Sequence, residues 1–353
     1  MPSSRHRTAA SLWRNTPRDT PRSFSSGRGR DDCLATTRGL LQLGGTLKVN
    51  TVLLFPGQGA QISGMLHTLG KHPAVGETLD EISEALGCDV RTFDSPEELK
   101  STVPVQLALL AAGVATARAL RRSGLAASAV AGLSVGAFSA AVAADAISLA
   151  EAITLVRSRA EQMEHLYPAG YGLAAIVGLN EKQVSRLVEL AYTNENPVFV
   201  ANINAPRQIV IAGSIAGMKK VLDDARSQGA RKAEYLDVSV PSHCSLMQPI
   251  ADSLRAQVGS MAVSDPKVPY LANVTGRALR SAQGVAHDLA DNIAHGVRWH
   301  DATTVAHELG CDLYLEMPPG HTLRDLALEN IPNISAYSVT NDNFDHVLKV
   351  AAN

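Results

Sequence analysis

One short stretch constrains the fold of this chain more than any other. Residues 129–144 read Ala-Val-Ala-Gly-Leu-Ser-Val-Gly-Ala-Phe-Ser-Ala-Ala-Val-Ala-Ala. The apolar start is typical of a buried strand, and the alanine-rich end favours a helix. Between them lies Gly-x-Ser-x-Gly, the pattern of a sharp strand-to-helix turn that exposes a serine hydroxyl beside the N–H groups of the new helix. Ser134 is therefore the candidate nucleophile, the alternative being a plain tight turn.

The size and composition of the chain are those of an ordinary globular protein. Its 353 residues are 45% hydrophobic and 19% charged, which is enough for one large domain with an insertion, or for two domains. The net charge of −2 gives no reason to expect nucleic acid or an anionic membrane as a partner. We see no apolar run approaching the roughly 18 residues of a membrane-spanning helix, and we therefore expect no membrane partner.

Cysteine usage points to a reducing compartment. The four cysteines are widely spaced and form no Cys-x-x-Cys pair; they are Cys33, Cys88, Cys244 and Cys311. This spacing suggests neither a disulfide framework nor a zinc site. Because we also find no apolar signal segment, we expect the protein to stay in the compartment where it is made.

The first 47 residues differ from the rest of the chain. They are rich in Ser, Arg, Thr, Pro and Gly, and residues 1–50 carry eight Arg and one Lys against three Asp, a net charge of +6. Such a segment cannot bury enough apolar surface to order itself, so we predict disorder over residues 1–47. An Arg- and Ser-rich start also resembles an organelle transit peptide. We favour a third interpretation, in which translation begins near Leu47 or Lys48 and the extension is spurious.

Beyond this segment, strands and helices alternate, which predicts a mostly parallel sheet. Residues 170–238 instead follow the order β-α-β-β-α-β of a ferredoxin-like unit. We therefore predict an α/β, hydrolase-like domain formed by residues 48–169 and 239–353. A small ferredoxin-like α+β subdomain is inserted at 170–238.

Two further features are candidates to assist Ser134 in catalysis, one as an oxyanion-binding loop and one as a base. The apolar strand Val52–Phe55 runs into a glycine-rich loop that carries Gln58, and such a loop can form an oxyanion-binding wall. A serine hydroxyl also needs a base. Of the eleven histidines, His243 is the best candidate, because it lies between Pro241 and a following helix, on a rigid loop at a sheet edge.

Several motifs together resemble one known family, that of the malonyl-CoA:acyl-carrier-protein transacylases, from about residue 50 to residue 330. They are Phe-Pro-Gly-Gln-Gly-Ala-Gln at 55–61, Gly-Leu-Ser-Val-Gly at 132–136, Arg159 with Met163, Val-Pro-Ser-His-Cys at 240–244 and Val-Arg-Trp at 297–299. Other stretches resemble more closely the malonyltransferase (epsilon) subunit of bacterial malonate decarboxylase. Among these are Ala-Asn-Ile-Asn-Ala-Pro-Arg-Gln-Ile-Val-Ile-Ala-Gly-Ser and Glu-Met-Pro-Pro-Gly.

The resemblance implies a ping-pong acyl transfer. Ser134, with His243 as base, attacks the thioester of malonyl-CoA, and the resulting malonyl-serine ester is then taken by a carrier-protein thiol. The family's oxyanion donors correspond to the backbone N–H groups of Gln58 and Val135. Arg159 would bind the free carboxylate of the malonyl group, a role that suits the two-pronged guanidinium.

The resemblance also implies the partners and the location. The acceptor is an acyl carrier protein with a phosphopantetheine-type arm, specifically the carrier subunit of malonate decarboxylase. Malonyl-CoA is the substrate, no bound cofactor or metal is implied, and the expected location is the bacterial cytoplasm.

Two positions depart from the family pattern. The family usually has His immediately before the nucleophile, where this chain has Leu133. The family also has Gln seven residues before the Trp of the Val-Arg-Trp motif, where this chain has Asn292. We expect the shorter amide of Asn292 to orient the histidine or the substrate. Both changes look like the malonate decarboxylase branch.

Three alternatives remain open from the sequence. The same chemistry could serve the carrier of fatty-acid synthesis. A serine hydrolase or thioesterase would instead release free malonate at a rate independent of any thiol acceptor. A non-catalytic interaction protein would be unaffected by the loss of Ser134.

Overall fold

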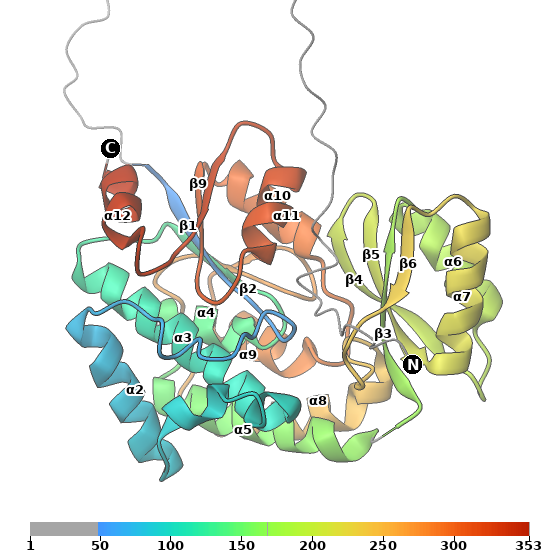
Figure 1. Cartoon of the computed structure of the whole chain (residues 1–353), viewed down its shortest axis with the longest axis horizontal. Helices are drawn as coiled ribbons and strands as arrows, with labels where there is room; N and C mark the ends of the chain where they lie inside the picture. The colour runs from blue at the N-terminus through green and yellow to red at the C-terminus, as the bar shows by residue number, and fades with distance from the viewer. Residues whose placement is uncertain (1–48, 168, 353) are drawn as a thin grey trace, which may run out of the picture.

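A six-stranded sheet forms the centre of the larger domain in the computed structural model, which describes residues 49–167 and 169–352 (Figure 1). The strand order is β10-β9-β1-β2-β7-β8. All neighbours are parallel except the β7–β8 pair, which confirms the predicted mostly parallel sheet. The strands are β1 (Thr51–Phe55), β2 (Ala129–Gly132), β7 (Tyr270–Leu271), β8 (Ala278–Leu279), β9 (Leu313–Glu316) and β10 (Ser335–Ser338).

Helices cover both faces of this sheet, because its central strands are apolar on both sides. In β1, Leu53 and Phe55 pack into the core under one helical layer, whereas Val52 and Leu54 pack into the other. The first layer comprises α2 (Pro73–Leu86), α3 (Thr102–Arg122), α4 (Gly136–Ala143), α5 (Leu149–Leu166), α8 (Gln248–Gly259) and α9 (Ala282–Asp291). The second comprises α10 (Trp299–Glu308) and α11 (Thr322–Asn330). The C-terminal helix α12 (Phe344–Ala352) follows β10, and short 3₁₀ turns lie at Val90–Asp94, Glu98–Lys100 and Ser245–Met247.

Helix α3 is the central helix of the first layer and packs against α2, α4 and α5. It corrects the expectation that no apolar run in the chain approaches the length of a membrane-spanning helix. Among the described residues it is the one helix long and apolar enough, by length and composition, to cross a membrane. In the structure 89% of that apolar stretch is buried inside the protein, so α3 is accounted for as a core helix.

A second, antiparallel sheet lies beside the first domain, with α6 (Glu181–Ala191) and α7 (Ile215–Ser227) on its outer face (Figure 1). Its order is β4-β5-β3-β6, which is the strand arrangement of a ferredoxin-like unit. The strands are β3 (Tyr171–Val177), β4 (Val198–Ala205), β5 (Gln208–Ser214) and β6 (Lys232–Tyr235). The inner face of the sheet packs against Cys244 of the larger domain.

Backbone hydrogen bonds join the small sheet to the larger domain through Val297, just before α10. Its N–H donates to the carbonyl of Ala201 and its carbonyl accepts from the N–H of Ile203, each at 2.8 Å. Arg298 adds an ion pair with Glu181, the first residue of α6. These contacts hold β4 beside the C-terminal half of the chain, where the cavity described below is formed.

The predictions for residues 1–47 and for Cys33 lie outside the described residues. The other three cysteines are free; Cys88 is exposed, and Cys244 and Cys311 are buried.

Candidate active site

The turn between β2 and α4 explains the glycine pattern around Ser134. Ser134 has a φ of 56°, in the left-handed region that non-glycine residues rarely adopt. A Cβ on Gly132 would lie 2.1 Å from the carbonyl of Gly136, and a Cβ on Gly136 would lie 2.2 Å from the carbonyl oxygen of Phe55. Only glycine therefore allows β1, β2 and α4 to approach closely enough to present the serine at the carboxyl edge of the sheet.

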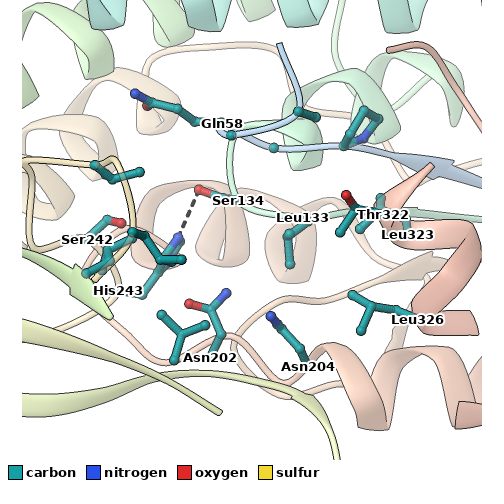
Figure 2. Close-up of a pocket in the computed structure, with 18 of the residues that line it drawn as sticks. Gln58, Leu133, Ser134, Asn202, Asn204, Ser242, His243, Thr322, Leu323 and Leu326 are labelled. Atoms are coloured by element: carbon teal, nitrogen blue, oxygen red, sulfur yellow. Dashed lines mark hydrogen bonds between the residues drawn. The ribbon is translucent and has the colours of Figure 1, made fainter. Parts of the chain in front are cut away.

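Ser134 and His243 meet as predicted although they are 109 positions apart in the chain. Figure 2 shows their hydrogen bond, in which Nε2 of His243 lies 2.9 Å from Oγ of Ser134. On the other side of the ring, Nδ1 lies 2.6 Å from the main-chain oxygen of Asn292. A carbonyl only accepts, so Nδ1 carries the hydrogen and Nε2 presents a lone pair to the serine hydroxyl.

The surroundings of His243 keep it neutral. Burial, and secondly the positive charge of Arg159, lower the pKa of His243 from 6.5 to about 4. The imidazole is therefore an unprotonated base at pH 7 and needs no carboxylate partner to hold its tautomer, because the Asn292 carbonyl does so.

This pKa predicts the pH profile of the first half-reaction. We expect kcat/KM for acylation of Ser134 to stay nearly constant from about pH 8 to about pH 5.5 and to fall as His243 is protonated near pH 4. A bound carboxylate would neutralise Arg159 and raise the pKa of His243, so the acid limb of kcat should lie at higher pH than that of kcat/KM. Rapid-quench measurements of acylation give the acid limbs of both pH profiles, that of kcat and that of kcat/KM. Circular dichroism at each pH checks that the protein is folded. A half-maximal rate near pH 6.5 in kcat/KM would show an unperturbed histidine.

Arg159 lies on the buried face of α5, beside the nucleophile. Its side chain is only 1% exposed, and Nη2 donates to Oγ of Ser134 at 2.9 Å. Burial lowers the pKa of Arg159 to about 9, so it is still a cation at pH 7. Within residues 49–167 and 169–352 it has no ion-pair partner, and its Nε has no hydrogen-bond acceptor. A buried, uncompensated cation is costly, so this position favours an anionic ligand.

Gln106 of α3 holds this arginine and was missed by the sequence analysis. It is fully buried, and its Oε1 accepts from Nη1 of Arg159 at 2.7 Å. Its Nε2 donates to Oε1 of Gln58 at 3.3 Å and to Sδ of Met163. The available signal was a single amide within an otherwise apolar helical run, since such an amide must find a partner in the core.

Two substitutions test the role of Gln106. We expect Gln106→Leu to lower kcat/KM for malonyl-CoA by about tenfold and to change acetyl transfer by less than about threefold, because only a bound carboxylate needs the oriented arginine. Gln106→Glu places a carboxylate against Arg159 and should lower malonyl transfer further. Equal losses for both acyl groups would show that Gln106 serves only the fold. Steady-state assays with malonyl-CoA and acetyl-CoA measure the ratio of the two kcat/KM values in each variant.

The predicted oxyanion donors lie on two segments next to the nucleophile. Val135 is the first residue after Ser134, and the loop that carries Gln58 packs on the turn so closely that a Cβ on Gly57 would lie 2.6 Å from the Leu133 carbonyl oxygen. In the described part of the chain, no acceptor is found for the main-chain N–H of Gln58 or Val135. Two unused donors in this position are suited to a developing oxyanion.

A cavity between the two sheets leads to Ser134, and Leu133 lies in its wall. Figure 2 shows Asn202 and Asn204 of β4 pointing into it from the small sheet. Both asparagines are at least nine-tenths buried, and Oδ1 of Asn204 has no partner among the described residues. Apolar wall residues come from both domains: Leu133, Leu173, Val210, Leu236, Val238, Leu323 and Leu326.

Asn292 contacts His243 through its main chain and not through its side chain. Its side chain is fully buried, and neither Oδ1 nor Nδ2 has a hydrogen-bond partner among residues 49–167 and 169–352. The main-chain carbonyl of Asn292, and not the amide, orients His243. We expected this amide to orient the histidine or the substrate; the first alternative is wrong, and the second stays a prediction. The described residues also contain no group of three His, Cys, Asp or Glu side chains able to hold a metal ion.

A serine–histidine pair on a strand-to-helix turn, at the carboxyl edge of a parallel sheet, defines a class of enzymes that move acyl groups through a serine ester. The comparison with known families gives the same class. Residues 52–334 match the family of acyl transferase domains, and the chain belongs to this family.

Within this family, the chain is similar to relatives that are named as malonyl transferases. The chain is 35% identical over 289 residues to the malonyl CoA-acyl carrier protein transacylase of Escherichia coli strain K12, covering 80% of this chain and 93% of that one. A solved structure of an acyl-carrier-protein S-malonyltransferase from Burkholderia pseudomallei is 36% identical, with a TM-score of 0.81, and the match covers 85% and 99% of the two chains. A malonyl-transacylase solved in complex with its type II PKS acyl-carrier protein is 35% identical, with a TM-score of 0.80 and coverage of 86% and 99%.

Proposed function

We propose that the protein transfers a malonyl group from malonyl-CoA to the thiol of an acyl carrier protein through an ester with Ser134. The observation that carries this proposal is the position of Arg159, a buried cation whose Nη2 lies 2.9 Å from the nucleophilic oxygen. The names of the relatives support the same substrates.

The position of the cation favours a short acyl group with a free carboxylate. In a malonyl thioester, one methylene separates the carboxylate from the carbonyl carbon that Ser134 attacks. A guanidinium beside the nucleophile can bind that carboxylate through two parallel hydrogen bonds. An acetyl group would leave Arg159 buried without a counter-charge, which disfavours it.

In the first half-reaction, Nε2 of His243 takes the hydroxyl proton of Ser134 while Oγ attacks the thioester carbonyl carbon. The negative charge that forms on the carbonyl oxygen would be stabilised by the N–H groups of Gln58 and Val135. When the carbon–sulfur bond breaks, the imidazolium returns its proton to the CoA thiolate. The enzyme is left as the malonyl-serine ester.

In the second half-reaction, the carrier thiol repeats these steps in reverse. It gives its proton to Nε2 of His243 and attacks the ester carbonyl, and the departing Ser134 oxygen recovers the proton. The apolar cavity walls would limit the access of water to the ester. The amides of Asn202 and Asn204 are suited to hydrogen-bond the amide groups of a phosphopantetheine-type arm.

Consumption of malonyl-CoA with and without a thiol acceptor tests this function. We expect one equivalent to be consumed quickly as the serine ester forms, followed by slow hydrolysis, and rapid turnover once a carrier bearing the arm is added. A hydrolase would turn over at the same rate in both conditions. That result would overturn the proposal.

The finer proposal concerns the carrier. We propose that the acceptor is the carrier subunit of malonate decarboxylase, on the grounds of the sequence stretches that resemble its epsilon subunit and of Leu133 and Asn292. The second candidate is the carrier of fatty-acid synthesis, which the relatives named as malonyl CoA-acyl carrier protein transacylases favour. Charging both purified carriers in one assay separates them. Efficient charging of the fatty-acid carrier alone would reject the finer proposal.

A further inference from the structure

A buried asparagine that the mechanism above does not use clamps the nucleophile turn. Oδ1 of Asn273 accepts from the N–H of Ser134 at 2.9 Å, and its Nδ2 donates to the carbonyl of Gly132 at 2.8 Å. Asn273 follows β7, 139 positions after Ser134, and is only 2% exposed. One side chain thus bonds the chain on both sides of Leu133.

We propose that Asn273 is a positioning residue that holds Ser134 in its reactive conformation. Ser134 sits at a φ of 56°, so an unrestrained serine would favour other backbone conformations. The two hydrogen bonds fix the backbone between Gly132 and Ser134, and with it the direction in which Oγ points toward His243. Because Asn273 occupies the Ser134 N–H, the next N–H, that of Val135, is the one left for the oxyanion.

Asn273 is itself held from behind by Asp288 of α9. One oxygen of Asp288 accepts from the N–H of Asn273 at 3.1 Å and from the hydroxyl of Tyr270 at 2.8 Å, and the other accepts from the N–H of Val274 at 2.9 Å. The carbonyl of Asn273 accepts from the N–H of Arg298 at 2.8 Å. All four polar groups of Asn273 are therefore hydrogen-bonded, so its side chain has one stable orientation.

This network also connects the Val-Arg-Trp motif to the active site. Val297 binds β4 on either side of Asn202, whose side chain lines the cavity, and Arg298 binds Asn273 through its main chain. The same short segment therefore connects one wall of the cavity to the residue that holds the nucleophile.

The first test compares Asn273→Ala with the wild type, using malonyl-CoA and p-nitrophenyl acetate. Only the measurement with malonyl-CoA rests on the proposed function. The measurement with p-nitrophenyl acetate does not, since this ester needs only a correctly placed Ser134. We expect the rate constant for acylation to fall by about 100-fold with both substrates, and KM for malonyl-CoA to change by less than about threefold. Unchanged acylation per folded molecule, or a loss confined to KM, would overturn the inference.

The same measurements separate the two proposals. If wild-type Ser134 reacts with p-nitrophenyl acetate but not with malonyl-CoA, the proposed function fails and the positioning role is still tested by the acetate ester. Tyr314→Phe is the stability control, because it removes another buried hydrogen bond, from the Tyr314 hydroxyl to the Thr303 carbonyl in the core. This variant should lower the melting temperature without slowing acylation.

Asn273→Asp provides a second test if the alanine variant does not fold. An ionised carboxylate keeps the acceptor for the Ser134 N–H but cannot donate to the Gly132 carbonyl, and it faces Asp288 and Tyr270. A protonated carboxyl restores both an acceptor and a donor. We expect acylation by Asn273→Asp to rise as the pH falls from about 8 to about 5.5, where the wild-type rate stays flat. A flat profile at the wild-type rate would overturn the inference.

Discussion

Ser134→Ala is expected to abolish the acyl-enzyme and to lower malonyl transfer by at least about 10³-fold, because the Ser134 hydroxyl is the group that hydrogen-bonds Nε2 of His243, at 2.9 Å. Intact-mass measurement after mixing with malonyl-CoA checks this directly. The wild type should gain one malonyl group and Ser134→Ala none.

The matched control for this experiment is Ser139→Ala. Ser139 is a second serine of the same helical segment, buried in α4 and one turn beyond the nucleophile. This variant should form the adduct at the wild-type rate. A malonyl adduct that persists in Ser134→Ala would place the nucleophile elsewhere and would contradict the proposed mechanism.

Arg159→Ala is expected to lower kcat/KM for malonyl-CoA by about 10²- to 10³-fold while acetyl transfer falls little or rises. The reason is that only the malonyl carboxylate bonds the guanidinium, whereas an acetyl group binds beside a buried, unpaired cation. Arg159→Lys keeps the charge but loses the planar fork, so its malonyl activity should lie between those of the alanine variant and the wild type. Transfer assays with malonyl-CoA and acetyl-CoA give the ratio of malonyl to acetyl transfer for each variant.

Arg157→Ala controls for the loss of an arginine from the same helix. Arg157 lies two residues earlier in α5, is 54% exposed and pairs with Glu161 at the surface. Its replacement should leave both acyl transfers unchanged. Equal losses of malonyl and acetyl transfer in Arg159→Ala would mean that Arg159 supports the fold and does not bind the carboxylate.

The predictions from sequence succeeded where the physical cause is local. The pattern around Ser134 indicates a strand-to-helix turn because a side chain at position 132 would clash with position 136: a Cβ on Gly132 would lie 2.1 Å from the Gly136 carbonyl. The need for glycine at position 136 is different, because a Cβ there would lie 2.2 Å from the carbonyl oxygen of Phe55, in a distant strand. The alternation of strands and helices likewise indicated a mostly parallel sheet. The expectation that no apolar run approaches about 18 residues was wrong, because α3 is long and apolar enough to reach that length.

The predictions were incomplete or wrong where the partners are distant in the chain. Gln106 and Arg159 are 53 positions apart, and Asn273 and Ser134 are 139 apart. No local pattern marks either pair. The expectation that the Asn292 amide orients His243 was wrong for another reason: a main-chain carbonyl takes that role, and every residue type carries one.

The sequence by itself determined the nucleophile turn, the alternation of strands and helices and, through the resemblance to a family, the pairing of Ser134 with His243. Only the tertiary structure decided that Arg159 is a buried cation with no counter-charge among the described residues, and that Asn273 and Gln106 hydrogen-bond Ser134 and Arg159. The physical reason is that steric limits on a turn act between near neighbours, and residue identity records them. Burial and hydrogen-bond partnership depend on which distant segments the fold brings together.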